Sequence, residues 1–552
     1  QEIRALIARV DGSVEKGALG ALLALGIEEL RTYGSALTVD ARLSLPSRAG
    51  YNECHSVMKS ATMLTSSVRR ACLVSIAALS LCSCASTPVT GRPDLVFSSE
   101  KGEVERAKQV HPMLLQQFGG LYDDLRLQQY VNEVGQRAAK ASHRPELQYT
   151  FTVLDSEEIN AFTTGGGFVY ITRGIMNYLN SEAELTAVLG HEIGHITARH
   201  PARQQTQSTL SGIGAAAVGI FTGSGDLAGL ANYAGAALIS GYGRDMELEA
   251  DRLGAEYLAK TGQDPDHMID VVRLLKNQEL FEVQRARQEN RKPRIYHGVF
   301  STHPDNDQRL REVVKAAEKV ASPTDRADAG RERYLQAIEG LPVGTSRAQG
   351  VLKGNRFYHA HLGFTLAFPS GWTVENQADR VLSVSPRKDS IMQLRMLAPP
   401  PNTNPQQFLS RLLAGKNAAP GEAIEINGMQ GYTTVVRSER TEFGVAPARY
   451  AVVYHNNLAY VFAGTSKASS TVPSADPLFM SSIKTFRRLR SNEYALAEPY
   501  KIKIIRADTN TRIADLAKAS PLKEYAAETL RLLNNLYPDK EPQPGQLLKI
   551  VQ

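Results

Sequence analysis

One segment constrains the fold more than any other: residues 180–200 read NSEAELTAVLGHEIGHITARH. Ser181 is a typical helix N-cap residue, and Glu184 follows three positions later, as in a capping box. Apolar residues then recur at helical spacing, which predicts an α-helix through this stretch. His191 and His195 are four residues apart, so they lie on one face of that helix and can present two imidazoles to a single metal ion.

Glu192 stands beside the two histidines and is placed to take a proton from a water that the metal activates. A catalytic zinc site normally has three protein ligands, so we expect a third one elsewhere in the chain. Residues 243–254 read GRDMELEADRLG, in which Glu247 and Asp251 share a helical face and Glu249 points to nearly the opposite side. One of the two carboxylates on the shared face can bind zinc, and the other can hydrogen-bond a ligand histidine.

The composition supports this choice of ligands and excludes several classes of protein. The chain has 552 residues, too many for one hydrophobic core, so we expect three or four domains. Its formal charge of +6 is small and no basic stripe is interleaved with aromatic residues, so nucleic acid is not an expected partner. The four cysteines all precede residue 85, so any metal in the rest of the chain must be held by His, Asp or Glu.

The N-terminal part resembles an export signal. Arg69 and Arg70 precede an apolar run over residues 71–81 that is too short to span a bilayer. The run ends in LCSC, which resembles the bacterial lipobox and makes Cys84 the expected lipidation site. Ala85, which follows, resembles the sorting signal for the outer membrane of a Gram-negative cell. The alternative is a cleaved signal peptide with an incidental cysteine.

These features predict the organisation of the first hundred residues. We expect an upstream mistranslated extension over residues 1–57, a signal peptide with lipobox over residues 58–84, and an N-terminal tether over residues 85–100.

Three motifs together resemble peptidase family M48, whose members include BepA-like and HtpX-like envelope proteases. They are GHEIGH at residues 190–195, ELEAD at residues 247–251 and STHP at residues 301–304. The resemblance implies a mainly helical zincin domain of the gluzincin type over residues 101–320, with one zinc ion per subunit. The expected fold class of the whole chain is α+β.

The resemblance also implies roles for particular residues. Glu247 matches the third metal ligand of the family, and Asp251 matches the aspartate of the family's motif, which we expect to hydrogen-bond a ligand histidine. His303 matches a histidine that can approach the metal, and Arg309 matches an arginine in the active site. We expect His303 or Arg309 to help stabilise the oxyanion of the reaction.

A glycine-rich stretch over residues 160–171 resembles the family's edge strand. An extended substrate can pair its backbone with such a strand without a strict sequence requirement. We expect Gly166, Gly167 and Phe168 to be the part that meets the substrate, with the glycines removing side-chain bulk. The alternative is a plain hairpin turn.

The rest of the chain predicts a linker and two more domains. Residues 321–350 are rich in charge and small residues and are expected to be the linker. Residues 351–490 predict an α+β domain that loosely resembles the PsbP or Mog1 type. Residues 496–552, with expected helices at 513–518 and 529–536, resemble the β-α-α-β LysM module that binds peptidoglycan. A degenerate packing domain is the alternative for this last region.

Together these inferences predict a zinc-dependent endopeptidase of the bacterial envelope, an outer-membrane lipoprotein that faces the periplasm. Its expected substrates are misfolded or misassembled outer-membrane proteins, and its expected partners also include peptidoglycan and the outer-membrane assembly machinery. The alternative is an assembly chaperone or a peptidoglycan-tethered scaffold with a dormant metal site. Glycan hydrolysis is disfavoured because no carboxylate pair with catalytic context is evident.

The role of His303 leads to a test whose outcomes differ in sign. If His303 occupies the open metal position at rest, His303→Ala raises peptidase activity. If it donates to the oxyanion, the same change lowers activity by about a hundred-fold or more. If it only caps a turn before Pro304, activity and zinc affinity stay the same.

We expect the increase, because a histidine on a loop can leave the metal when a client binds. Casein cleavage by His303→Ala and by the parent protein, compared at equal zinc occupancy, measures the sign. A fall in the cleavage rate would reject the hypothesis that His303 occupies the open metal position at rest.

Overall fold

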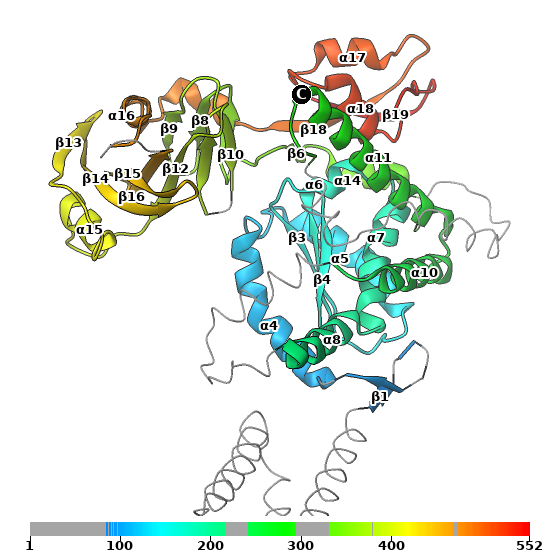
Figure 1. Cartoon of the computed structure of the whole chain (residues 1–552). Coiled ribbons are helices and arrows are strands. Elements are labelled where there is room, and N and C mark those ends of the chain that lie inside the picture. Colours follow the sequence, from blue (N-terminus) through cyan, green and yellow to red (C-terminus); the bar gives the residue numbers. More distant parts are fainter. Residues whose placement is uncertain are drawn as a thin grey trace, which may run out of the picture. The chain divides into compact units, whose positions relative to one another are not determined.

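The structure is a computed structural model, drawn in Figure 1. It describes residues 84–86, 88–89, 91, 93–96, 98–215, 241–293, 309, 330–377, 379–467 and 472–552. Within these residues there is a mainly helical region up to α14, a sheet-rich domain and a small C-terminal module. None of the described helices is both long and apolar enough to cross a membrane.

The helical region combines many helices with a short sheet. It begins with two short paired strands, β1 (Cys84–Ser86) and β2 (Pro93–Leu95). Its further elements are α4 (Glu100–Gln117), α5 (Leu125–Lys140), β3 (Thr150–Leu154), β4 (Ala161–Gly165), β5 (Phe168–Thr172), α6 (Arg173–Tyr178), α7 (Glu182–Thr197), α8 (His200–Ala215), α10 (Arg244–Lys260), α11 (Asp266–Gln288) and α14 (Arg331–Ile338). The mixture of helix and sheet agrees with the expected α+β class.

The three-stranded sheet of this region has the order β3-β5-β4, with β3 parallel and β4 antiparallel to β5. Helix α4 covers one face, where Leu154 and Tyr170 pack with Leu114. Val153 and Ile171 point to the other face and belong to the main core, to which α5 and α7 contribute (Figure 1). Side chains of a strand alternate between faces, so each strand serves both layers.

Helix α7 starts where the sequence predicts it. Ser181 is the N-cap, and its hydroxyl accepts a hydrogen bond from the backbone N–H of Glu184 at 3.1 Å. The second half of the expected capping box differs, because the Glu184 carboxylate accepts from the N–H of Asn180 at 2.7 Å, one residue before the N-cap. Burial raises the pKa of Glu184, and the hydrogen bond from Asn180 opposes that rise.

The expected linker over residues 321–350 contains helix α14 in its described part, residues 330–350. Tyr334, Leu335 and Ile338 of α14 are fully buried in the same core as α7. The Tyr334 hydroxyl donates to the carbonyl of Met176 at 2.6 Å. The small and charged residues of this stretch hid an amphipathic helix that belongs to the helical region.

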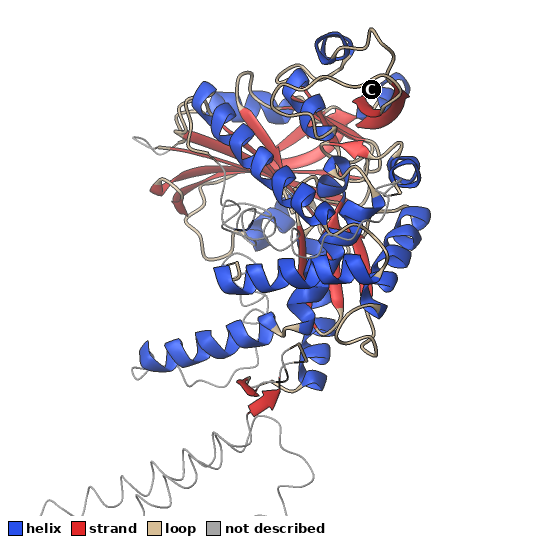
Figure 2. Cartoon of the chain, turned by 90° about the vertical axis from the view of Figure 1, so that its right-hand side faces the viewer, coloured by secondary structure: helices blue, strands red, loops and turns tan. Residues whose placement is uncertain are grey.

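The sheet-rich domain contains a seven-stranded and a four-stranded sheet. The seven-stranded sheet has the order β10-β11-β12-β16-β15-β14-β13 and the four-stranded sheet the order β17-β9-β8-β7. The strands of the described residues are red in Figure 2. The elements are β7 (Val351–Lys353), β8 (Arg356–His359), β9 (Phe364–Ala367), β10 (Thr373–Asn376), β11 (Val381–Val384), β12 (Ser390–Leu397), α15 (Pro405–Leu412), β13 (Glu422–Ile426), β14 (Met429–Thr441), β15 (Gly444–His455), β16 (Leu458–Ser466), α16 (Asp476–Lys484) and β17 (Arg487–Arg488). The 3-10 helix η2 (Ser491–Ala497) follows.

The C-terminal module has the element order β-α-α-β. It consists of β18 (Tyr500–Arg506), α17 (Ile513–Ala519), α18 (Ala526–Leu533) and β19 (Leu547–Val551). Strand β6 (Pro342–Val343) adds to β18, so the sheet order is β19-β18-β6. The first helix lies at the expected residues and the second begins three residues earlier than expected. The likeness of this module to LysM stays a prediction.

A buried lysine ties the C-terminal module to the start of the α7 helix. The Lys549 side chain is fully buried, and its ammonium donates to the carbonyls of Asn177 and Leu179 at 2.7 and 2.6 Å. Burial holds the pKa of Lys549 well below its ordinary value, and the nearby Glu184 carboxylate opposes that fall. Arg331 bridges the same contact by donating to the carbonyls of Asn180 and Leu547, at 3.0 and 2.9 Å.

Lys549→Met tests this contact. We expect the change to lower the free energy of unfolding of the helical region by about 3–5 kcal/mol, because it leaves two buried carbonyls and Glu184 without their cation. Circular dichroism at 222 nm during urea unfolding reports on the helices, whereas the single tryptophan, Trp372, lies in the sheet-rich domain. The control is Lys503→Met on the exposed side of β18, which we expect to stay within about 0.5 kcal/mol of the parent. Equal stability of the two variants would contradict the contact.

Candidate metal centre

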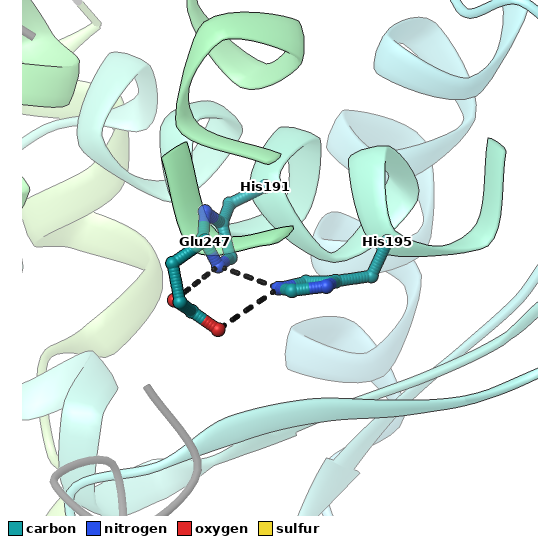
Figure 3. Close-up of side chains that lie close together, drawn as sticks. All are labelled: His191, His195 and Glu247. Atoms are coloured by element: carbon teal, nitrogen blue, oxygen red, sulfur yellow. Dashed lines mark hydrogen bonds and ion pairs between the residues drawn. The ribbon is translucent and has the colours of Figure 1, made fainter. Parts of the chain in front are cut away.

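Two helices bring three candidate ligands together. His191 and His195 come from α7, and Glu247 comes from α10 (Figure 3). The two Nε2 atoms lie 2.9 Å apart, and each lies 3.6 Å from an oxygen of the Glu247 carboxylate. His191 is 5% exposed and the other two are fully buried. The sequence predicted this set, with Glu247 chosen by resemblance.

Glycines explain how α10 comes close enough to reach the histidines. A Cβ added to Gly190 would lie 3.3 Å from the Cα of Gly254, and one added to Gly194 would lie 3.1 Å from the carbonyl oxygen of Ala250. A Cβ added to Gly254 would lie 3.0 Å from the backbone nitrogen of His191. Side chains at these positions would push the two backbones apart and withdraw Glu247 from the site.

The donor set fits zinc. Two imidazole nitrogens and one carboxylate are the His₂Glu set of catalytic zinc sites, which leave a fourth position open. Two ligand atoms bound to one tetrahedral ion lie roughly 3.3 Å apart, given metal–ligand distances of about 2.0–2.1 Å. The separations of 2.9 and 3.6 Å bracket this value, so small side-chain shifts are enough to seat the ion.

Asp251 and Arg309 support one side of the centre. The Nδ1 of His191 lies 2.9 Å from an Asp251 oxygen, which leaves Nε2 for the metal. Arg309 makes two hydrogen bonds to Asp251, at 2.8 and 2.7 Å, and its third nitrogen lies 3.1 Å from Glu247. Burial opposes ionisation of Asp251, but the charge of Arg309 and hydrogen bonds from Arg309 and His191 hold the pKa of Asp251 below its ordinary value. This geometry favours a role of Arg309 in positioning the metal ligands. The expected role of Arg309 at the oxyanion stays a prediction.

The sequence did not indicate the residues on the other side of the centre. The Nδ1 of His195 lies 2.8 Å from the Nδ1 of His200, and the Nε2 of His200 lies 3.1 Å from Glu249. Burial lowers the pKa of His200, against the influence of Glu249, and the hydrogen bond from His200 lowers the pKa of Glu249 to about 2. Tyr242 stacks on the His195 ring at 4.0 Å between centroids. The one signal in the sequence was a third histidine five residues after His195.

Glu192 lies next to the ligands and is 1% exposed. A cavity beside His191 and Glu192 is lined mainly by apolar side chains. Its other lining residues are Ala161, Ile175, Val188, Met268, Val271, Leu275 and Arg309. Apolar surroundings strengthen electrostatic interactions and favour proton transfer by a buried carboxylate.

The structure corrects the position of the edge strand. Within the described residues the edge next to α7 is β4, whereas Phe168 opens β5, the central strand. Gly166 and Gly167 form the turn between them, with φ of +59° and +91°. A Cβ on Gly167 would lie 2.1 Å from the carbonyl oxygen of Gln148, so turn geometry and close packing require the glycines rather than substrate access.

A second group of possible ligands does not have the character of a metal site. Glu184, His267 and Asp270 place ligand atoms within 4.8 Å of one another. However, His267 already hydrogen-bonds Asp270 at 3.2 Å, and Asp270 pairs with Arg273 at 2.8 Å. The ammonium of Lys549 also acts on Glu184, so positive charge already balances this cluster.

The described residues do not test the roles of two further expected site residues. His303 lies outside the described residues, together with the rest of the STHP motif. Cys84 is described as the first residue of β1, where it pairs with Leu95. The expected roles of both residues remain predictions.

The comparison with protein families decides the class of the helical region. Residues 125–317 match the model of Peptidase family M48, and this range includes all three candidate ligands. Residues 125–317 of the helical region thus form an M48 peptidase domain. The match supports a metalloprotease of this family.

The M48 domain has relatives in bacteria and in mitochondria. The beta-barrel assembly-enhancing protease of Escherichia coli (strain K12) is 30% identical over 246 residues, which are 43% of this chain and 46% of that protein. The mitochondrial metalloendopeptidase OMA1 of Arabidopsis thaliana is 31% identical over 144 residues, which are 26% of this chain and 29% of that protein. The chain thus spans less than half the length of these curated relatives.

One solved structure is similar to a quarter of the chain. Cyanobacterial PsbP from Synechocystis sp. PCC 6803 covers 25% of this chain and 95% of its own, with 15% identity and a TM-score of 0.20. A score this low carries no argument, so the PsbP-like fold of residues 351–490 stays a prediction.

Proposed function

We propose that this protein is a zinc-dependent endopeptidase of the bacterial envelope that cleaves misfolded or misassembled outer-membrane proteins. The observation that carries the proposal is the convergence of His191, His195 and Glu247 beside the buried carboxylate of Glu192. The similarity to a beta-barrel assembly-enhancing protease supports the envelope location and the class of substrate.

The ligands and the base divide the chemistry between them. His191, His195 and Glu247 would hold a zinc ion, which would supply Lewis acidity and lower the pKa of a water at the site. Glu192 accepts the proton of the attacking water and then donates it to the leaving amine. Asp251 and Arg309 hold His191 and Glu247 in place, and both are almost completely buried, so these hydrogen bonds are shielded from water.

Strand β4 is the proposed docking site for the substrate backbone. It is one of the two edges of the sheet in the described part of the domain, and its Ala161 lines the cavity that His191 and Glu192 also line. A peptide that extends the sheet at this edge would carry its backbone past the metal with few demands on its side chains. This suits a protease for unfolded clients.

Glu192→Gln tests the peptidase mechanism. The amide keeps the size of the side chain but cannot accept the proton, so we expect casein cleavage to fall by about 10²–10⁴-fold while zinc content and helical circular dichroism are retained. Glu256→Gln is the matched control, because Glu256 lies on α10 away from the ligands and pairs with His143.

The result also separates the two function classes. Loss of cleavage in Glu192→Gln and in the chelated parent, with full activity in Glu256→Gln, agrees with an active protease. A zinc-loaded parent that does not cleave casein would favour the alternative, an assembly chaperone or a peptidoglycan-tethered scaffold with a dormant metal site.

We also propose that Cys84 carries lipid and anchors the protein to the outer membrane. The LCSC motif and Ala85 support this proposal. We expect the native protein to fractionate with outer membranes, and mass spectrometry of its N-terminal peptide to show acylated Cys84. Cys84→Ser should release the protein into the soluble fraction. A native product with unmodified Cys84 would overturn the anchor.

A further inference from the structure

The turn after helix α7 brings a third histidine back to the metal centre. Helix α7 ends at Thr197, and Arg199 has a φ of +56°, in the left-handed region. The Arg199 guanidinium donates to the Glu103 carboxylate and to the carbonyl of Ser98, the latter at 2.7 Å, which fixes the turn against the start of α4. His200 begins α8 and is fully buried.

We propose that His200 and Glu249 are positioning residues that orient the metal ligand His195 through a chain of hydrogen bonds. The proposal rests on the proposed function, because it assigns the Nε2 of His195 to zinc. The other nitrogen of His195 lies 2.8 Å from the Nδ1 of His200, and the Nε2 of His200 lies 3.1 Å from a Glu249 oxygen.

The hydrogen-bond directions follow from the chemistry of the rings. A neutral imidazole has one N–H and one acceptor nitrogen. With Nε2 of His195 on the metal, its proton is on Nδ1, so His195 donates to Nδ1 of His200. The proton of His200 is then on Nε2 and is donated to the Glu249 carboxylate. Each hydrogen bond determines the direction of the next one. A Glu249 carboxylate that accepts from His200 therefore selects the tautomer of both histidine rings that leaves the Nε2 of His195 for the metal.

The proposal explains the spacing of the ELEAD segment. Glu247, Glu249 and Asp251 come from one turn of α10, but they serve the centre differently. Glu247 points at both histidines, and Asp251 contacts His191 directly. Glu249 points to nearly the opposite side of the helix, where the turn after α7 brings His200 to meet it.

Tyr242 completes the support of His195. Its ring is nearly parallel to the His195 ring, at 22° and 4.0 Å between centroids. The stacked Tyr242 therefore restrains tilting of the His195 ring, while His200 restrains its rotation. Such outer contacts affect metal affinity, and their loss typically weakens it by about 10–100-fold.

The test measures the zinc dissociation constant of the full chain by competition with a chromogenic chelator. We expect His200→Leu to bind zinc about 10–100-fold more weakly than the parent, because Leu offers no acceptor to His195. His200→Gln should recover most of this loss, since its amide oxygen can accept from His195 and its amide nitrogen can donate to Glu249. If His200 had only a structural role, Gln at this position would not be expected to restore zinc affinity.

Variants of Glu249 test the order of the chain. Glu249→Ala should weaken zinc binding. The matched control is Glu256→Ala, which also removes a carboxylate of α10 that pairs with a histidine, here His143, and it should leave zinc binding unchanged. The double variant His200→Leu/Glu249→Ala should bind zinc no more weakly than His200→Leu alone, because Glu249 acts through His200. Circular dichroism of the apo-proteins checks that each variant is folded.

The outcomes separate this inference from the proposed function. A parent that binds no zinc overturns both. A parent that binds zinc, together with parent-like affinity in His200→Leu, overturns the positioning role alone. Additive losses in the double variant overturn the serial arrangement. If His200→Leu does not fold, parent-like zinc affinity in Glu249→Ala still rejects the proposal.

Discussion

The close packing of α7 against α10 is the contact on which the centre depends. The backbones meet where Gly190 faces Gly254 and Gly194 faces Ala250, and an added Cβ at either glycine would lie 3.1–3.3 Å from the other helix. Only at this separation does the short carboxylate arm of Glu247 reach both ligand histidines. Gly190, just before the His-Glu-x-x-His motif, and Gly194, within it, therefore set the distance between the helices, while the histidines set the chemistry.

The sequence predicted what is local to one helix. Ser181, His191, Glu192 and His195 needed only helical periodicity and cap chemistry, and the structure places all four on or at the start of α7. Glu247 lies more than fifty residues further on, so its choice over Asp251 needed a resemblance rather than spacing. A single helical segment shows which side chains share a face, but it does not show which other helix that face meets.

The residues that sequence reasoning missed depend on turns and on tertiary packing. His200 reaches His195 only because Arg199 adopts a left-handed conformation, which single-residue propensities rarely predict. Strand β4 rather than Phe168 is the edge because β5 pairs on both sides. The sequence predicts a linker where α14 lies because the stretch is rich in charge and small residues, although Tyr334, Leu335 and Ile338 are fully buried. In each case a long-range contact outweighed the local pattern.

The two ligand histidines are held in place by hydrogen-bond chains of different length. His191 is held through a direct contact with Asp251, which Arg309 holds in turn. His195 is held through His200, a longer arm whose far end is Glu249. Both arms end on α10, the helix that also supplies Glu247. Any shift of α10 along α7 would therefore move the third ligand and both orienting carboxylates together, so the metal centre is either assembled as a unit or lost as a unit.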